Sequence, residues 1–281
     1  MMCRNVAHRS SFSGLRLPLA GLLIFVVVPG TLRSQTPAAA LPAQAAPPVL
    51  EVAAIKPVKN PSPNNMQDRT EGRRLLARNT SVRDLIMMSY ELDPRQVLGG
   101  PAWVASDEYD IDAEAVEGVQ LNDQKQEKSL IRQLLTERFQ LAFHREQRTL
   151  PVYLLVVAKN GPRLKAADPN EIENSGCEHL GACTFKKRTL SDFSRFMQFA
   201  VLDRPVVDKT GIAGEFDFSL NWTPDESQFS RMGILPRPPA DNANAPPLFA
   251  AIQEQLGLRL EAVKAPVDIL VIDRVERPSE N

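Results

Sequence analysis

The sequence predicts an α+β fold, in which helices pack on mixed or mostly antiparallel sheets. Three observations support this class. Short amphipathic helices alternate with strands. The two halves of the chain have matching sequence patterns at an offset of 108 residues. The last strands of each half are apolar on both faces. A repeat period above 100 residues indicates an internally duplicated domain-sized unit and not a solenoid. We therefore expect two similar helix-strand-helix-hairpin units.

The first helix of each half has the same start signal. Ser81-Val-Arg-Asp84 opens one and Thr189-Leu-Ser-Asp192 opens the other, and both are close to a capping box. Apolar residues then recur at helical spacing, namely Val82, Leu85, Ile86 and Tyr90 in the first helix and Leu190, Phe193, Phe196 and Met197 in the second.

The remaining elements follow in the same order in both halves. Strands are expected at 108–112 and 215–219, and second helices at 124–138 and 247–256. Each half then ends in a hairpin, with strands at 139–143 and 151–157 in the first and at 256–260 and 266–272 in the second. An extra strand begins near Val49. Two separate sheets and one shared sheet both satisfy this pattern.

The composition limits the classes of function. The chain has 281 residues, 43% of them hydrophobic and 24% charged, which is ordinary for a globular protein. Its net charge of -1 argues against a basic surface for nucleic acid. The sequence lacks the common motifs of serine hydrolases, zinc proteases, P-loop enzymes and dinucleotide-binding enzymes. We expect no cofactor, no metal and no catalytic residue, so an enzyme is disfavoured.

Residues 1–34 have the pattern of a signal peptide. Four arginines and no acid occur there, and Leu17 to Val28 is an apolar run of 12 residues, too short to span a bilayer. Cleavage after Ser34 would leave a mature net charge of -5. The expected location is the periplasm or the cell exterior, without stable membrane insertion. The alternative is an uncleaved anchor.

The rest of the chain divides at changes of composition. Residues 35–48 are a Pro/Ala-rich spacer, 49–165 the first half, 166–188 a cysteine-containing loop, and 189–281 the second half. The second half contains a Pro-rich loop at 223–247 with six prolines. A loop of that length is mobile or functional.

Cys177 and Cys183 are expected to form a disulfide, because an exported protein meets an oxidising compartment. The alternative adds His179 as a third ligand of a metal site, which lacks a fourth ligand of obvious spacing. Asp208-Lys-Thr-Gly211 matches parts of phosphorylated-Asp and penicillin-binding motifs. The partners that those motifs need are missing, so a glycine turn is the preferred interpretation.

Several further side chains are candidate sites. Glu108, Asp110, Asp112 and Glu114 share one strand face, which would suit Ca²⁺ but more often is simply solvated.

Three residues are candidates for ligand or partner contact. His144 would act as a general base beside Glu146, or lie at the surface without a role. Trp103 and Trp222 would mark a partner surface, although packing in the core is favoured for both.

Eight segments together resemble a soil-associated secreted protein family of acidobacteria (Solibacter type), a domain of unknown function. They are Glu51–Pro57, Ser81–Ile86, Gly99–Trp103, Asp107–Ala113, Leu141–Glu146, Leu155–Pro162, Arg204–Gly211 and Ile272–Asn281. The resemblance covers about residues 49–281. It implies no catalytic residues, because none are established for the family. Related domains attached to membrane sensor peptidases of the β-lactam-sensor type imply an extracytoplasmic sensing or interaction role.

A second resemblance covers one half. Residues Thr189–Leu220 are similar to the short N-terminal module of secretins and TonB-dependent receptors, without a diagnostic residue. It implies binding to an envelope protein. We therefore expect a non-enzymatic exported interaction module, with an unidentified envelope protein as its partner. The alternatives are a small-ligand sensor, with ligand between the halves or under the Pro-rich loop, and an unfamiliar enzyme using His144 and Glu146.

Overall fold

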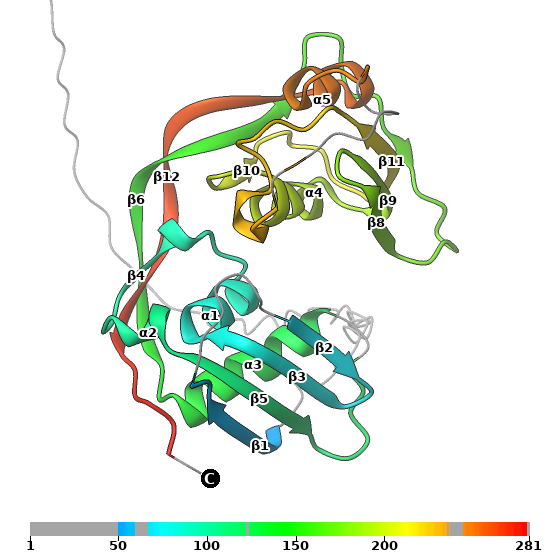
Figure 1. Cartoon of the computed structure of the whole chain (residues 1–281). Helices are drawn as coiled ribbons and strands as arrows, with labels where there is room; N and C mark the ends of the chain where they lie inside the picture. The colour runs from blue at the N-terminus through cyan, green and yellow to red at the C-terminus, as the bar shows by residue number, and fades with distance from the viewer. Residues whose placement is uncertain (1–49, 60–66, 122–123, 235, 237–243, 280–281) are drawn as a thin grey trace, which may run out of the picture. The chain divides into compact units, whose positions relative to one another are not determined.

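The computed structural model describes residues 50–59, 67–121, 124–234, 236 and 244–279, which all belong to one compact unit. The expected signal peptide at 1–34 and spacer at 35–48 lie outside these residues. Two lobes, each with its own hydrophobic core, are joined by two long strands, β6 (Ala142–Val157) and β12 (Leu258–Arg274) (Figure 1). The α+β class is confirmed, and within the described residues the strands form three four-stranded sheets that are mostly antiparallel.

The first lobe pairs an antiparallel sheet, in the order β1-β5-β3-β2, with helices α1 and α3. Its elements are β1 (Leu50–Pro57), β2 (Gln67–Glu71), β3 (Arg74–Ser81), α1 (Val82–Tyr90), η1 (Pro94–Gln96), β4 (Val97–Gly99), α2 (Trp103–Ser106), β5 (Glu108–Ala115) and α3 (Gln124–Arg138). The capping box expected at Ser81 and Asp84 is present and starts α1.

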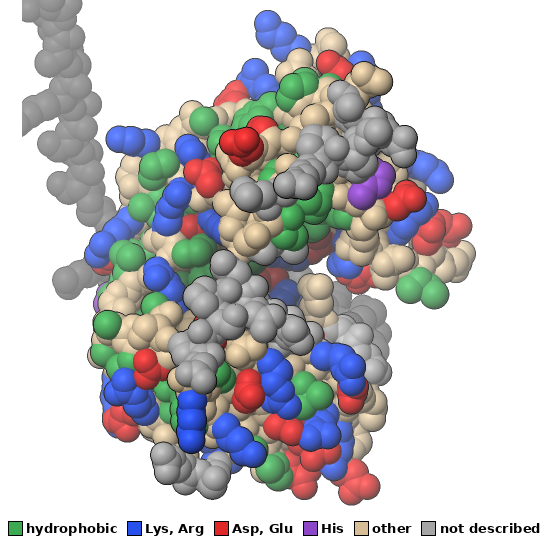
Figure 2. Space-filling view, in the orientation of Figure 1, with side chains coloured by type: hydrophobic (Ala, Val, Ile, Leu, Met, Phe, Trp, Pro, Cys, Tyr) green, Lys and Arg blue, Asp and Glu red, His purple; other side chains and the backbone are tan. Residues whose placement is uncertain are grey.

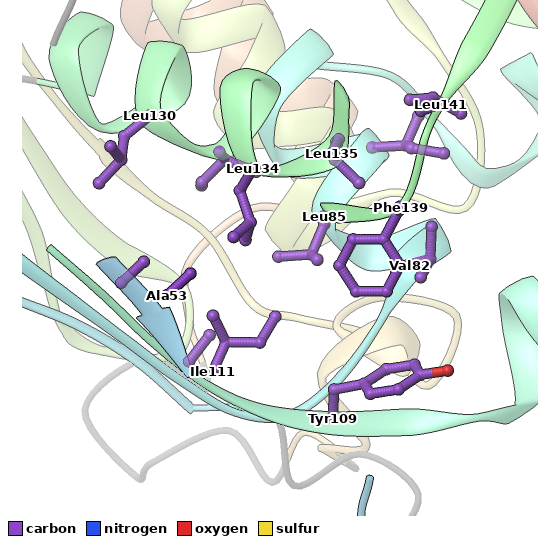
Figure 3. Close-up of a cluster of buried hydrophobic side chains, with 14 of the residues drawn as sticks. Ala53, Val82, Leu85, Tyr109, Ile111, Leu130, Leu134, Leu135, Phe139 and Leu141 are labelled. Atoms are coloured by element: carbon purple, nitrogen blue, oxygen red, sulfur yellow. The ribbon is translucent and has the colours of Figure 1, made fainter. Parts of the chain in front are cut away.

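Strand β5 shows why this lobe folds as it does. Its residues alternate strictly, with Tyr109, Ile111 and Ala113 buried under the helices. Helix α3 contributes Leu134 and Leu135 to the same core, and the rings of Tyr109 and Phe139 meet edge to face at 5.4 Å between centroids (Figure 3). The opposite face of β5 carries the acidic residues.

Two of the four acids on this face of β5 pair with arginines of the neighbouring turn and strand. Arg74 pairs with Asp112, and Arg73 pairs with Glu114 at 3.1 Å. The hydrogen bond from Arg74 lowers the pKa of Asp112. Basic and acidic side chains lie side by side over this lobe in Figure 2.

The second lobe repeats this plan with a sheet in the order β7-β11-β9-β8. Its elements are β7 (Lys165–Ala166), β8 (Asn174–His179), β9 (Ala182–Arg188), α4 (Leu190–Phe196), η2 (Met197–Val201), β10 (Val206–Asp208), β11 (Phe216–Asn221), η3 (Ser230–Met232) and α5 (Leu248–Leu256). The segment expected as a loop at 166–188 therefore contains a β-hairpin. The two ends of the Pro-rich loop are joined by Thr223, whose Oγ1 donates to the Ala245 carbonyl at 2.8 Å. The loop is held to the lobe by the Phe229 N–H, which donates to the Val201 carbonyl at 3.0 Å.

Strands β6 and β12 pair with each other along their whole length, from Val157 opposite Leu258 to Ala142 opposite Arg274. We call this antiparallel pair the ladder. The two expected hairpins are thus wrong. Each is a single strand, and the two strands come from different halves of the chain. The prolines at 151 and 266 do not break them. The Tyr153 N–H donates to Pro205 O outside the ladder, so the Pro151 nitrogen, two residues earlier, also points away from β12.

The ladder enters both cores. Leu270 and Ile272 of β12 pack in the first lobe, whereas Leu258 and Leu260 of the same strand pack in the second. Strands β10 and β4 extend the sheet by pairing in parallel with β6 and β12, giving the order β10-β6-β12-β4.

The two lobes contain the same local irregularity. A residue in the left-handed region, Asn79 in one lobe and Lys187 in the other, interrupts the register at the end of a strand. Its N–H donates to an aspartate on the neighbouring strand, to Asp110 at 3.2 Å and to Asp217 at 3.0 Å. The topologies correspond, and duplication of the chain as their origin stays a prediction.

The aspartate at the second of these bulges should make the protein sensitive to acid. The backbone hydrogen bond from Lys187 lowers the pKa of Asp217, and the lysines nearby act in the same direction. Because the unfolded chain then binds this proton more readily, stability is present above the ordinary aspartate pKa and is lost as the pH falls.

Asp217→Asn removes the titrating group. We expect its melting temperature to fall less than that of the wild type between about pH 6 and pH 3. Ser219→Ala, on the same strand, is the control and should keep the wild-type profile. Equal acid dependence in Asp217→Asn and the wild type would contradict this account.

Candidate functional site

A pocket of about 360 Å³ lies where α1 and α3 of the first lobe face β8, β9, α4 and η2 of the second. This volume falls within the range of small-molecule sites. One part of its wall is apolar, and it is formed by Met88, Ile131, Phe185, Phe196 and Phe199. The other part is polar, and it is formed by Glu91, Gln124, Glu127, Lys128, Ser175, Arg188, Asp192 and Arg195.

Glu91 is the centre of the polar wall. It ends α1 in a left-handed conformation, with φ of 59°, and its N–H donates to the Met87 carbonyl. Its Oε1 receives Lys128 Nζ from α3 at 2.5 Å and Arg195 Nε from α4 at 3.1 Å. One carboxylate of the first lobe thus contacts cations from both lobes.

The capping box of α4 supplies a second part of the polar wall. Asp192 Oδ2 accepts hydrogen bonds from the Thr189 N–H at 3.0 Å and from its hydroxyl at 2.5 Å. The other oxygen of Asp192 pairs with Arg195. The motif that starts the helix therefore also fixes the arginine that reaches Glu91.

A buried ion pair lies beside the pocket. Asp93 is fully buried, and its carboxylate pairs with Arg231. Arg231 also donates to the Gln198 carbonyl at 2.9 Å, and the Gln198 side chain reaches the Glu91 carbonyl at 3.4 Å. These bonds join the first lobe, at Glu91 and Asp93, to the second lobe, at Gln198 and Arg231, and so hold the two parts of the pocket wall together.

His144 lies on β6, where its side chain is exposed and does not line this pocket. Its Nδ1 is 2.8 Å from Asp273 Oδ1 on β12. Glu146 instead accepts a hydrogen bond from Arg148 at 2.6 Å. His144 is thus an exposed histidine paired with Asp273, and the alternative pairing with Glu146 is absent.

The two tryptophans both pack. Trp222 is fully buried, its Nε1 donates to Gln228 Oε1 at 2.7 Å, and its ring stacks on Phe229. A buried indole has no surface to offer a partner. Trp103 begins α2 and packs against the first core, with the Arg277 guanidinium 4.9 Å above its ring.

The cysteine pair is a disulfide between Cys177 and Cys183, which links β8 to β9. His179 lies on the same hairpin. Because both cysteines form the disulfide, neither is a thiolate that could bind the metal of the alternative site. In the part of the chain that the structure describes, no three His, Cys, Asp or Glu residues are grouped to hold a metal ion.

The turn interpretation of the Asp208 motif agrees with the geometry. Asp208 Oδ1 accepts from the Thr210 N–H at 2.9 Å and from its hydroxyl at 2.7 Å.

The sequence did not identify the residues of the pocket as a site. They come from six elements, and most have a local role that explains them. One signal was available, because four phenylalanines lie close together in the sequence, namely Phe185, Phe193, Phe196 and Phe199. Phe193 is buried, whereas Phe196 and Phe199 are only half-buried and line the pocket.

The arrangement is suited to binding. It offers an apolar surface beside a fixed polar wall, and these features hold a small molecule in one orientation. None of the helices described has the length and apolarity to span a bilayer.

The buried pair beside the pocket gives a stability prediction. Asp93→Asn leaves the Arg231 charge without its counter-ion, so the free energy of unfolding should fall by about 2–3 kcal/mol. Urea denaturation measures this change. Glu71→Gln, which removes one partner of the exposed pair with Arg69, is the control and should change stability by less than about 0.5 kcal/mol. Equal small effects of both substitutions would show that the pair does not hold the junction.

No curated protein and no solved structure matches the chain. A family described as protein of unknown function, DUF3738, matches residues 83–275. This range includes α1 from its second residue, the whole ladder up to Arg274 and all residues of the pocket. The chain therefore belongs to the DUF3738 family of proteins of unknown function.

Proposed function

We propose that this protein is an exported, non-enzymatic binding domain that holds a small, largely apolar molecule in the pocket between α1–α3 and α4–β9. The observation that carries the proposal is the wall of five apolar side chains beside a fixed polar cluster, both within one pocket of about 360 Å³. This is the small-ligand alternative of the sequence analysis, with the ligand between the halves.

Export is part of the same proposal. It is supported by the basic and apolar pattern of residues 1–34 and by the disulfide on the β8–β9 hairpin, because disulfides persist mainly in oxidising compartments. The resemblance to the secreted acidobacterial family supports it as well.

A protein-interaction role is the second candidate. Ile172, just before β8, exposes 83% of its surface, and Phe249 on α5 exposes 41%. Large apolar side chains exposed to this degree are typical of contact surfaces when they cluster. An envelope protein docking on the second lobe, as the secretin-like resemblance implies, would bury one of these side chains.

The small-ligand proposal is tested with N-phenyl-1-naphthylamine, a neutral apolar probe that fluoresces in apolar sites. We expect saturable binding at one site. Phe199→Ala should weaken it about tenfold, which corresponds to about 1.4 kcal/mol. Phe249→Ala removes an exposed phenylalanine outside the pocket and is the matched control, expected to bind as the wild type does. Binding that is absent, or that is indifferent to Phe199→Ala, would contradict the proposal.

A further inference from the structure

The charged side chains of the polar wall differ in how many of their hydrogen-bonding atoms have a partner within the protein. Glu91 and Asp192 are satisfied by Lys128 and Arg195, as described above, and by the start of α4. Glu127 is also partnered. The acids of the wall are thus engaged within the protein. Any preference for a charged ligand must come from a group that is still unsatisfied.

Arg188 is that group. It is the last residue of β9, and only 14% of its side chain is exposed. One terminal nitrogen pairs with Glu173, which does not line the pocket, while the Nε of Arg188 is buried and has no hydrogen-bond partner. A guanidinium nitrogen can only donate, so what it lacks is an acceptor. Leaving such a charged donor unsatisfied is costly. Because the Nε itself is buried, an acceptor in the pocket would reach it through a small shift of the guanidinium, which lines the pocket.

The apolar wall limits what can carry the acceptor. Phe185 forms edge-to-face or stacked contacts with Phe193, Phe196 and Phe218, so its ring is held in place beside Arg188 on the same strand. The pocket volume is equivalent to about a dozen water molecules at their share of liquid volume. A body with one ring and a short chain fits that space, and so does the larger N-phenyl-1-naphthylamine.

We propose that the ligand of this pocket is an amphipathic carboxylate, with its anionic group bound by Arg188 and its apolar body on the phenylalanine wall. This inference rests on the proposed function and specifies the ligand class. The three basic and three acidic side chains of the wall balance, so the preference comes from the unpaired donor and not from net charge. A carboxylate is the acceptor that a guanidinium binds most strongly.

Three probes that share one body test the head group. They are 3-phenylpropanoate, 3-phenylpropanamide and 3-phenylpropylammonium, each titrated against the full chain by calorimetry. We expect the carboxylate to bind at least about tenfold more tightly than the amide, and the ammonium to bind most weakly. Arg188→Gln should reduce carboxylate affinity about tenfold and leave the amide unchanged. Arg188→Lys, which keeps the charge and loses the Nε donor, should fall between.

Arg148→Gln, an exposed arginine on β6, is the matched control and should bind all three probes as the wild type does. Retained binding of N-phenyl-1-naphthylamine by Arg188→Gln shows that the variant is folded. Equal binding of the three probes in the wild type, or a preference for the ammonium, would overturn the carboxylate assignment and leave the small-ligand proposal standing. A carboxylate preference that survives Arg188→Gln would overturn the role of Arg188. Binding of none of the three probes would overturn the carboxylate assignment, and the small-ligand proposal would fall with it only if N-phenyl-1-naphthylamine also fails to bind.

Discussion

The antiparallel pairing of β6 with β12 is the interaction on which the rest of the structure depends. A two-stranded ribbon is marginal by itself in water. Here each end is anchored, since Leu270 and Ile272 are buried in one core and Leu155 and Leu258 in the other. The exposed middle, from about residue 144 to 151 of β6, therefore needs little packing of its own. Each lobe has its own four-stranded sheet, and the pairing of β6 with β12 joins the two lobes into one unit.

The pocket follows from this pairing. It is lined by helices that belong to different lobes, and it exists because the ladder and the bonds around Asp93, Arg231 and Gln198 bring those helices together. Glu91 has a special place in this arrangement. Its left-handed backbone ends α1 and directs its carboxylate to Lys128 and Arg195. A non-glycine residue in this conformation is uncommon, and such residues are enriched at functional positions.

Local patterns in the sequence were sufficient for the elements. The capping boxes at Ser81 and Thr189, and the helix at 124–138, could be predicted because each depends on neighbours within one turn or a few turns. The long strands could not, since proline at 151 and 266 normally ends a strand. Whether it does depends on which side the missing N–H faces, and only the partner strand decides that.

The site was harder to predict for the same reason. Nothing in the sequence around Arg188, Glu91 or Phe199 marks these residues as part of a site. They line one pocket only because strands and helices distant in the sequence pack together. The disulfide was predictable, because it closes a short loop on one hairpin. His144 was a reasonable candidate by residue type. Its partner, Asp273, is 129 residues away and could be found only from the register of the ladder.

The central claim is that both lobes form a single ligand pocket. Hydrogen–deuterium exchange of the full chain, with and without N-phenyl-1-naphthylamine, tests it most directly. The account predicts that the probe slows exchange in peptides covering α1 and α3 and, at the same probe concentration, in peptides covering α4 and η2. Protection confined to one lobe, or located on the exposed middle of the ladder, would contradict it.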